Sequence, residues 1–232
     1  MSTHHHHHEH HNKSSEALRD FVIGMSDGLT VPFALAAGLA GAVDTTTLIV
    51  VAGVAEIAAG TVAMGLGGYM GAKTEKEHYD AEHRRETYEV AELTHVEESE
   101  TNDILRSFGV PEEHLASVTK GIMRDPKKWV DFMMKFELGL EKPDPRRIYQ
   151  SPLIIGGAYA LGGFIPLLPY ILFTHVSEAL PVSCVMSLIA LFSFGAFKGH
   201  FTGQKMLRSA LQTSMIGALA AATAFAIAKL VG

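Results

Sequence analysis

The sequence predicts an all-α integral membrane protein with five transmembrane helices and a polar three-helix module that continues from the second span. Apolar segments long enough to cross a membrane occur five times. The charges are segregated, because 17 of the 25 carboxylates lie between Glu75 and Glu141. Between Thr47 and Ser107 there is no proline, so a helix can run from an apolar segment directly into a polar one.

The five apolar segments each approach the ~20 residues of a helix that spans a bilayer. They are Phe21–Val43, Leu48–Ala72, Ile148–Phe173, Leu180–Phe197 and Leu207–Val231. The first could instead be a signal peptide, since Lys13 and Arg19 precede it and Ala40-Gly41-Ala42 resembles a cleavage site. Asp27 within the segment and the four spans after it favour a membrane helix.

The second span and the polar stretch after it organise the chain. Leu48 to Ala72 contains one charge, Glu56, whereas Lys73 to Glu100 is almost wholly polar. We expect Thr47–Ser107 to be one continuous helix, apolar where it crosses the membrane and polar where it stands in water as a stalk.

The expected domain order follows from these segments. Residues 1–15 form a tag or disordered N-terminus with a run of histidines, residues 16–72 hold spans one and two, residues 73–145 the polar module, and residues 146–232 spans three to five. Within the module, Phe108-Gly109-Val110-Pro111 ends the long helix, and Glu112–Met123 forms a second helix. Asp125-Pro126 caps a third, with one face formed by Trp129, Phe132, Met133, Phe136 and Leu140.

Basic residues indicate the orientation. They precede span one, occur in the module and flank the connection between spans four and five, so these regions should be cytosolic. The connections around Asp44 and at Thr174–Pro181 contain no Lys or Arg and should lie on the far side, together with the C-terminal Gly232. No region is basic enough for nucleic acid, and the lone Cys184 excludes an intrachain disulfide.

Four glutamates share one face of the expected long helix: Glu86, Glu89, Glu97 and Glu100. Like charges at this spacing repel, so they need either solvent screening or a bound cation. A solvated acidic face is the simpler interpretation. Glu137 with Met133 and Met134 on the third helix favours a cation instead, because thioether beside carboxylate suits ferrous iron, cobalt or zinc better than magnesium, calcium or manganese. Met133 taken alone is better explained as core packing than as a metal ligand.

The acids deepest in the apolar segments are Asp27 and Glu56, and charged groups at such depths are usually functional. Asp27 and Met64 lie at similar depths from the cytosolic ends of adjacent spans, so a carboxylate and a thioether could converge on one ion. Glu56 lies two turns beyond Met64, where an outward-moving ion would meet it next. The alternative for Glu56 is a structural hydrogen bond to a neighbouring helix.

Glycines on spans one and two allow close approach of helices or a small cavity. Five spans leave little room for a pore within one subunit. A two-fold homodimer would place two copies of Asp27, Glu56 and Met64 around a central path, and we expect this assembly in the lipid bilayer.

The residues that carry these features resemble the plant-type vacuolar iron transporters with a cytosolic metal-binding insertion. The similar stretches are Ser26 to Ala34, Met64 to Tyr69 and the Glu-rich insertion between spans two and three. The resemblance implies exchange of ferrous iron for protons across the vacuolar membrane. It also implies that Asp27, Met64 and Glu56 form the membrane site, and that the cytosolic metal ligands are Glu86, Glu89, Glu97, Glu100, Met133, Met134 and Glu137.

We therefore expect a secondary transporter of Fe²⁺, with Mn²⁺, Co²⁺ and Zn²⁺ as further candidates, and neither an enzyme nor a holder of a resident cofactor. A metal-gated divalent cation channel or a membrane-anchored metal sensor is the alternative that the sequence leaves open.

Overall fold

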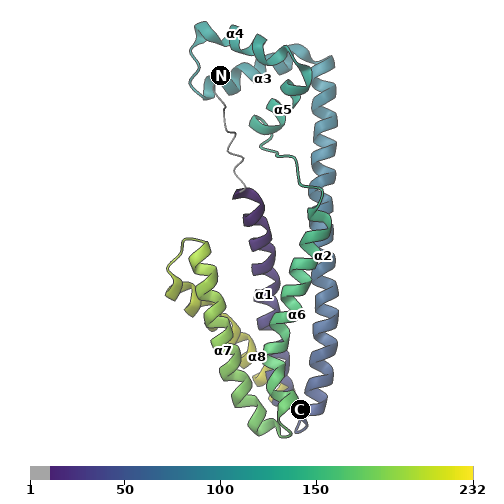
Figure 1. The fold of residues 1–232 in the computed structure, drawn as a ribbon, viewed down its shortest axis with the longest axis vertical. Helices are drawn as coiled ribbons and strands as arrows, with labels where there is room; N and C mark the ends of the chain where they lie inside the picture. The colour runs from purple at the N-terminus through teal and green to yellow at the C-terminus, as the bar shows by residue number, and fades with distance from the viewer. Residues whose placement is uncertain (1–10, 232) are drawn as a thin grey trace, which may run out of the picture. The chain divides into compact units, whose positions relative to one another are not determined.

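The computed structural model describes residues 11–231 and is helical, with no strand among these residues. The predicted histidine run, His4 to His8 with His10, lies outside the described residues. In chain order (Figure 1) the helices are α1 (His11–Ala40), α2 (Thr46–Glu92), α3 (Thr94–Ser107), α4 (Glu112–Met123), α5 (Pro126–Phe136), α6 (Arg147–Leu172), α7 (Val176–Phe201) and α8 (Met206–Val231).

The described chain divides into two compact units. One, here the span unit, contains the residues up to Tyr69 and those from Ile148 onward. The other, the central unit, is Met70–Arg147. The 47-residue helix α2 contributes its residues up to Tyr69 to the span unit and its residues from Met70 onward, with the whole polar part, to the central unit.

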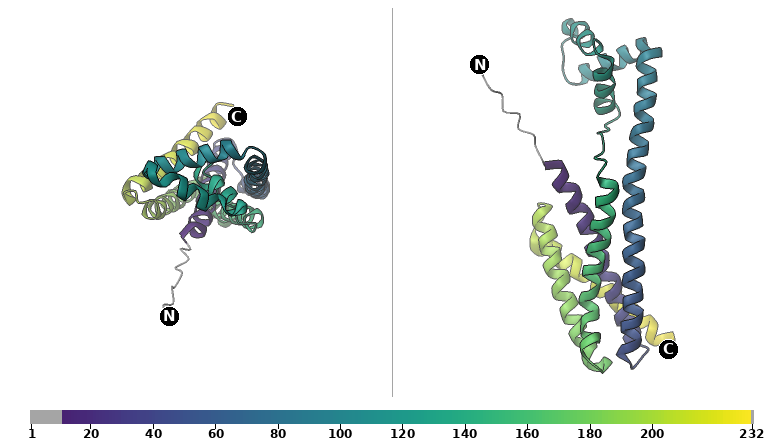
Figure 2. Two further views of the ribbon diagram at one scale, coloured as in Figure 1. Left: turned by 90° about the horizontal axis from the view of Figure 1, so that it is seen from above. Right: turned by 45° about the vertical axis from the view of Figure 1, so that its right-hand side comes forward.

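The span unit bears out the prediction of five spans. Within the described chain, five helices have the length and apolar composition needed to cross a membrane: α1, α2, α6, α7 and α8. Three of them, α1, α7 and α8, pack against one another, and their courses can be followed in the two views of Figure 2. Leu29 and Phe33 of α1 and Leu191 of α7 are almost fully buried there.

Two connections meet at one end of the span unit. Thr45, before α2, forms an isolated antiparallel bridge with His175, before α7. The Thr46 hydroxyl also donates to the Thr174 carbonyl at 3.5 Å. The α1–α2 and α6–α7 connections therefore lie at the same end of the bundle, as an alternating arrangement of spans requires.

The central unit has its own core, formed by Tyr79, Val90, Trp129, Val130, Met133 and Met134. The predicted helix Glu112–Met123 is present, preceded by a turn in which Gly109 adopts φ +83°, a conformation that favours glycine. Asp125 caps α5 as expected, because its side chain accepts a hydrogen bond from the Lys127 backbone. The predicted apolar face of α5 is partly wrong: Phe136 is 45% exposed, whereas Met134 is buried.

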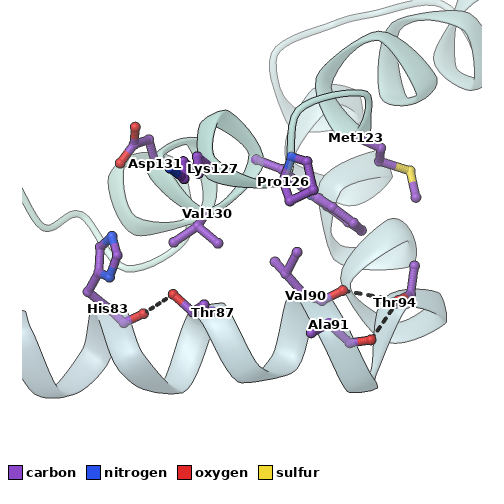
Figure 3. Close-up of a pocket in the computed structure, with 11 residues that line it drawn as sticks. His83, Thr87, Val90, Ala91, Thr94, Met123, Pro126, Lys127, Val130 and Asp131 are labelled. Carbon is purple, nitrogen blue, oxygen red and sulfur yellow. Dashed lines mark hydrogen bonds between the residues drawn. The ribbon is translucent and has the colours of Figure 1, made fainter.

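The prediction of one continuous helix over Thr47–Ser107 is wrong. The helix ends at Glu92, and α3 begins at Thr94 after Leu93, whose φ of −115° and ψ of 30° are not helical. The Thr94 hydroxyl donates to the Val90 carbonyl at 3.0 Å, as the dashed lines in Figure 3 show. A threonine that bonds back to the carbonyl four residues earlier competes with the helical backbone and bends the helix, with no need for glycine or proline.

Candidate metal sites

Three glutamates from three segments of the central unit meet in one cluster. One carboxylate oxygen from each of Glu86, Glu97 and Glu137 lies within 4.8 Å of the others. Glu86 belongs to α2, Glu97 to the first turn of α3, and Glu137 to the C-terminal cap of α5. On a straight helix Glu86 and Glu97 would be about 16 Å apart along the axis. The bend at Leu93 is therefore what brings them together.

Two of the three carboxylates in the cluster are buried. Glu86 is 1% exposed and Glu97 is 3% exposed, whereas Glu137 lies at the surface. Glu86 Oε1 and Glu97 Oε2 have no hydrogen-bond partner among the described residues. Buried carboxylates without partners are costly unless they are neutralised by a proton or by a cation.

Burial, then the neighbouring carboxylates with Glu97 foremost, raises the pKa of Glu86 to about 8. The pKa of Glu97 is also raised, mainly by burial, although its hydrogen bond with Glu86 opposes the shift. Burial followed by the charges of Glu100 and Glu89 raises the pKa of Glu137. Without a metal, the cluster therefore retains a proton on Glu86 near neutral pH.

The remaining two glutamates of the predicted face flank this cluster. Glu89 and Glu100 are half-buried, and both lie close enough to Glu137 to influence its ionisation. Glu89 also forms an ion pair with Arg85 at 3.5 Å. The structure thus gathers all five predicted acidic ligands in one region but brings only three into direct proximity.

The two predicted methionine ligands lie in the core of the central unit. Met133 is 0% exposed and Met134 is 1% exposed. The Sδ atom of Met133 accepts a hydrogen bond at 3.3 Å from the hydroxyl of Thr101, a residue on α3 that the sequence reasoning missed. Both methionines pack in the hydrophobic core with Tyr79, Val90 and Trp129.

A separate pocket of about 670 Å³ opens on the central unit between α2 and α5 (Figure 3). It is lined by His83, Thr87, Val90, Ala91, Thr94, Met123, Pro126, Lys127, Trp129, Val130 and Asp131. None of the predicted metal ligands belongs to this lining. The pocket is therefore distinct from the carboxylate cluster.

In the span unit, the predicted membrane ligands occupy α1 and α2. Asp27 lies on an exposed side of α1, whereas Met64 and Glu56 on α2 are half-buried. No hydrogen bond or ion pair among the described residues links Asp27 with Met64. Within one subunit the predicted convergence of these two side chains on one ion thus stays a prediction.

Glu56 has a partner that was not identified from the sequence. The Tyr159 hydroxyl on α6 donates a hydrogen bond to Glu56 Oε1, while Glu56 Oε2 has no partner among the described residues. A side chain at Gly28 would collide with the Tyr159 backbone and one at Gly60 with its ring, so these glycines let α6 approach both helices.

A signal for Tyr159 was present in the sequence. It is the one tyrosine within the glycine-rich run 156–163, and a tyrosine hydroxyl inside an apolar span requires a hydrogen-bond partner. Glu56 was the acid available at a comparable depth. The hydrogen bond to a neighbouring helix, which the sequence left open as the alternative for Glu56, is therefore present.

Known proteins are similar to this chain along nearly its whole length. The model of the VIT family matches residues 18–229. Vacuolar iron transporter 1 of Arabidopsis thaliana is 52% identical over 94% of this chain and 87% of its own length. Vacuolar iron transporter 1 of Oryza sativa subsp. japonica is 49% identical over 94% and 86%. Protein CCC1 of Saccharomyces cerevisiae is 37% identical over 93% and 69%.

Proposed function

This chain belongs to the VIT family, and from that premise we propose that it is a secondary transporter that moves ferrous iron from the cytosol into the vacuole in exchange for protons. The names of the plant relatives, vacuolar iron transporters, support the metal and the compartment. The family and these relatives are transporters, so the protein is a transporter and not an enzyme. Its five apolar helices suit a multi-pass protein of the vacuolar membrane.

The observation that carries the proposal is the buried cluster of Glu86, Glu97 and Glu137. Three carboxylates with two unpartnered oxygens form a site whose charge a divalent cation would neutralise and whose oxygens would coordinate it. In this proposal the central unit contains a cytosolic metal-binding module, residues 73–145, that collects the ion. Glu89, Glu100, Met133 and Met134 complete the ligand supply, and the thioethers favour Fe²⁺, Co²⁺ or Zn²⁺ over Mn²⁺.

The proposed membrane path uses Asp27, Met64 and Glu56 in residues 16–72, and Tyr159 of residues 146–232 contacts Glu56. Asp27 lies on an exposed side of α1, which suits a ligand that faces a second copy of the chain. The path would then lie between two subunits, with two copies of each ligand.

A stripe of small residues supports the homodimer. Ala55, Ala59, Ala63 and Gly67 recur every four residues on α2, and all four are exposed in the single subunit. An added side chain at Gly67 would meet nothing within 4 Å. Small residues at this spacing allow two membrane helices to approach closely.

The orientation follows from the basic residues of the loops. Lys198, Lys205 and Arg208 flank the connection between α7 and α8, so we assign this connection to the cytosol. The N-terminus and the metal-binding module then also lie in the cytosol, and the C-terminus lies in the lumen. Positively charged loops are retained on the cytosolic side of membranes.

Transport into reconstituted vesicles tests the mechanism against its alternatives. An antiporter takes up Fe²⁺ only, or much faster, when the vesicle interior is acidic. Equal uptake with and without a pH difference would indicate a divalent cation channel. Metal binding without uptake under either condition would indicate a membrane-anchored metal sensor.

A further inference from the structure

The buried hydroxyl of Thr101 connects two side chains of α5. Trp129 Nε1 donates to Thr101 Oγ1 at 2.8 Å, and Thr101 in turn donates to Met133 Sδ at 3.3 Å. Thr101 and Met133 are each 0% exposed, and Trp129 is 3% exposed. Because the hydroxyl accepts from the indole, its own proton is directed at the sulfur.

This chain of hydrogen bonds lies one helical turn from the carboxylate cluster. Thr101 follows Glu97 by four residues on α3, and Met133 precedes Glu137 by four residues on α5. Residues four apart on a helix lie on the same face, one turn above the other. The contact of Glu97 with Glu137 and the contact of Thr101 with Met133 are thus successive links between the same faces of α3 and α5.

Methionine is a flexible ligand, because its side chain has three rotatable bonds and its thioether has no strong directional partner in most cores. A hydrogen bond to one sulfur lone pair fixes the position of the atom and leaves the second lone pair available to a cation. Fixing a ligand before binding removes the entropy that the side chain would otherwise lose when the metal arrives.

We propose that Thr101 is a positioning residue for Met133, and that it thereby sets the preference of the cytosolic metal site for softer divalent ions. The inference rests on the proposed metal-binding function of the Glu86, Glu97 and Glu137 cluster. Thr101 does not touch the metal in this proposal. It acts by holding the thioether beside the carboxylates, and Trp129 holds Thr101.

The test compares the affinity of the full-length protein in detergent for Co²⁺ and Mn²⁺, measured by titration calorimetry. All variants carry Met64→Leu, so that the proposed membrane site offers no thioether. Thr101→Val keeps the volume and removes the hydroxyl, whereas Thr101→Ser keeps the hydroxyl. Met133→Leu removes the sulfur itself and serves as the reference.

Thr101→Val should weaken Co²⁺ about tenfold and Mn²⁺ about twofold or less, because sulfur matters more to the softer ion. Thr101→Ser should preserve the ratio of the two affinities. The double variant Thr101→Val with Met133→Leu should be no worse than Met133→Leu, since both changes remove the same interaction.

Three results would overturn the inference. These are equal losses for both ions, no loss for either ion, and a selective loss of Co²⁺ binding in Thr101→Ser. If Thr101→Val does not fold, a selective loss of Co²⁺ binding in Thr101→Ser still overturns the inference. Failure of the proposed metal site would give a different result. In that case the Met64→Leu protein would show no Co²⁺ or Mn²⁺ binding that is lost when Glu86 and Glu97 are substituted.

Discussion

The Tyr159 hydroxyl donates a hydrogen bond to the Glu56 carboxylate, which joins α6 to the acid deepest in α2. Gly28 and Gly60 make room for this tyrosine, so the backbone of two other helices is adapted to it. An acid within a span is expensive, and here one of its oxygens is satisfied while Oε2 has no partner among the described residues. The hydrogen bond thus holds Glu56 in one orientation, with Oε2 left to contact an ion.

Tyr159→Phe should slow Fe²⁺ uptake into vesicles about tenfold, because loss of one hydrogen bond of ordinary strength frees Glu56 to rotate. Metal binding by the central unit should not change. Tyr149→Phe is the matched control, since Tyr149 lies on the same helix and is 72% exposed. Wild-type uptake by Tyr159→Phe would limit the hydrogen bond to a structural role.

Glu86→Gln combined with Glu97→Gln should abolish metal binding at the carboxylate cluster. Glutamine keeps the shape but removes the negative charge that a divalent cation requires. Titration calorimetry of the full-length protein should show loss of one class of sites. The exposed Glu92 and Glu113 provide a control pair for the same substitutions. An unchanged titration would make the cluster a protonated structural contact.

The stability of the metal-free protein should fall as the pH rises from about 5 to about 8. Glu86 has a folded pKa of about 8 against an ordinary value of 4.5, so over this interval the folded state holds a proton that the unfolded state has lost. The unfolding temperature, measured in detergent with a chelator, should decrease towards pH 8. In Glu86→Gln this dependence should be weaker, whereas Glu92→Gln should behave as the wild type. A flat profile in the wild type would contradict the raised pKa.

The small residues of α2 predict where two subunits meet. In a Cys184→Ser background, Ala59→Cys should form disulfide-linked dimers on mild oxidation, because equivalent residues approach each other across an isologous interface. Ala222→Cys on the exposed face of α8 is the control and should remain monomeric on denaturing gels. If Ala222→Cys cross-links and Ala59→Cys does not, the dimer forms through α8.

The five spans could be predicted from the sequence because length and apolar composition suffice for them. The turn at Gly109 and the cap at Asp125 were equally accessible, since glycine and aspartate act there through local backbone geometry. The break at Leu93 could not be predicted, because it depends on the hydrogen bond that the Thr94 hydroxyl donates to the Val90 carbonyl. Glu86 and Glu97 of the cluster were predicted as ligands because they share one face of a straight helix. The bend at Leu93 makes that reason wrong.

Two side-chain hydrogen bonds at the candidate sites were harder to foresee. Thr101 and Tyr159 are single polar residues whose importance comes from long-range contacts, with Met133 and Glu56 respectively. The glycine-rich run around Tyr159 indicates that its hydroxyl needs a partner, but the local sequence of Thr101 or Tyr159 does not specify which residue that partner is. These contacts depend on how α3 packs on α5 and how α6 packs on α2, which periodicity alone does not determine.

Asp27 and Met64 are predicted to form the transport site, and their substitutions should differ in kind. Asp27→Asn should abolish Fe²⁺ uptake into vesicles, because the amide keeps the size and hydrogen-bonding capacity but loses the charge that offsets a divalent ion in a low-dielectric region. Met64→Leu should be milder. Leucine conserves volume and removes only the thioether, so uptake of Fe²⁺ should fall more than uptake of Mn²⁺, for which sulfur is a poorer ligand.

The control is Asp44→Asn in the exposed connection between α1 and α2, which should transport normally. Each variant is first checked for folding and for assembly by size-exclusion chromatography, so that a defect in uptake reports on the site and not on the fold. A folded, dimeric Asp27→Asn protein that carries Fe²⁺ at the wild-type rate would place the path elsewhere. Glu56, held by Tyr159 with one oxygen unpartnered, would then be the acid that the ion meets first.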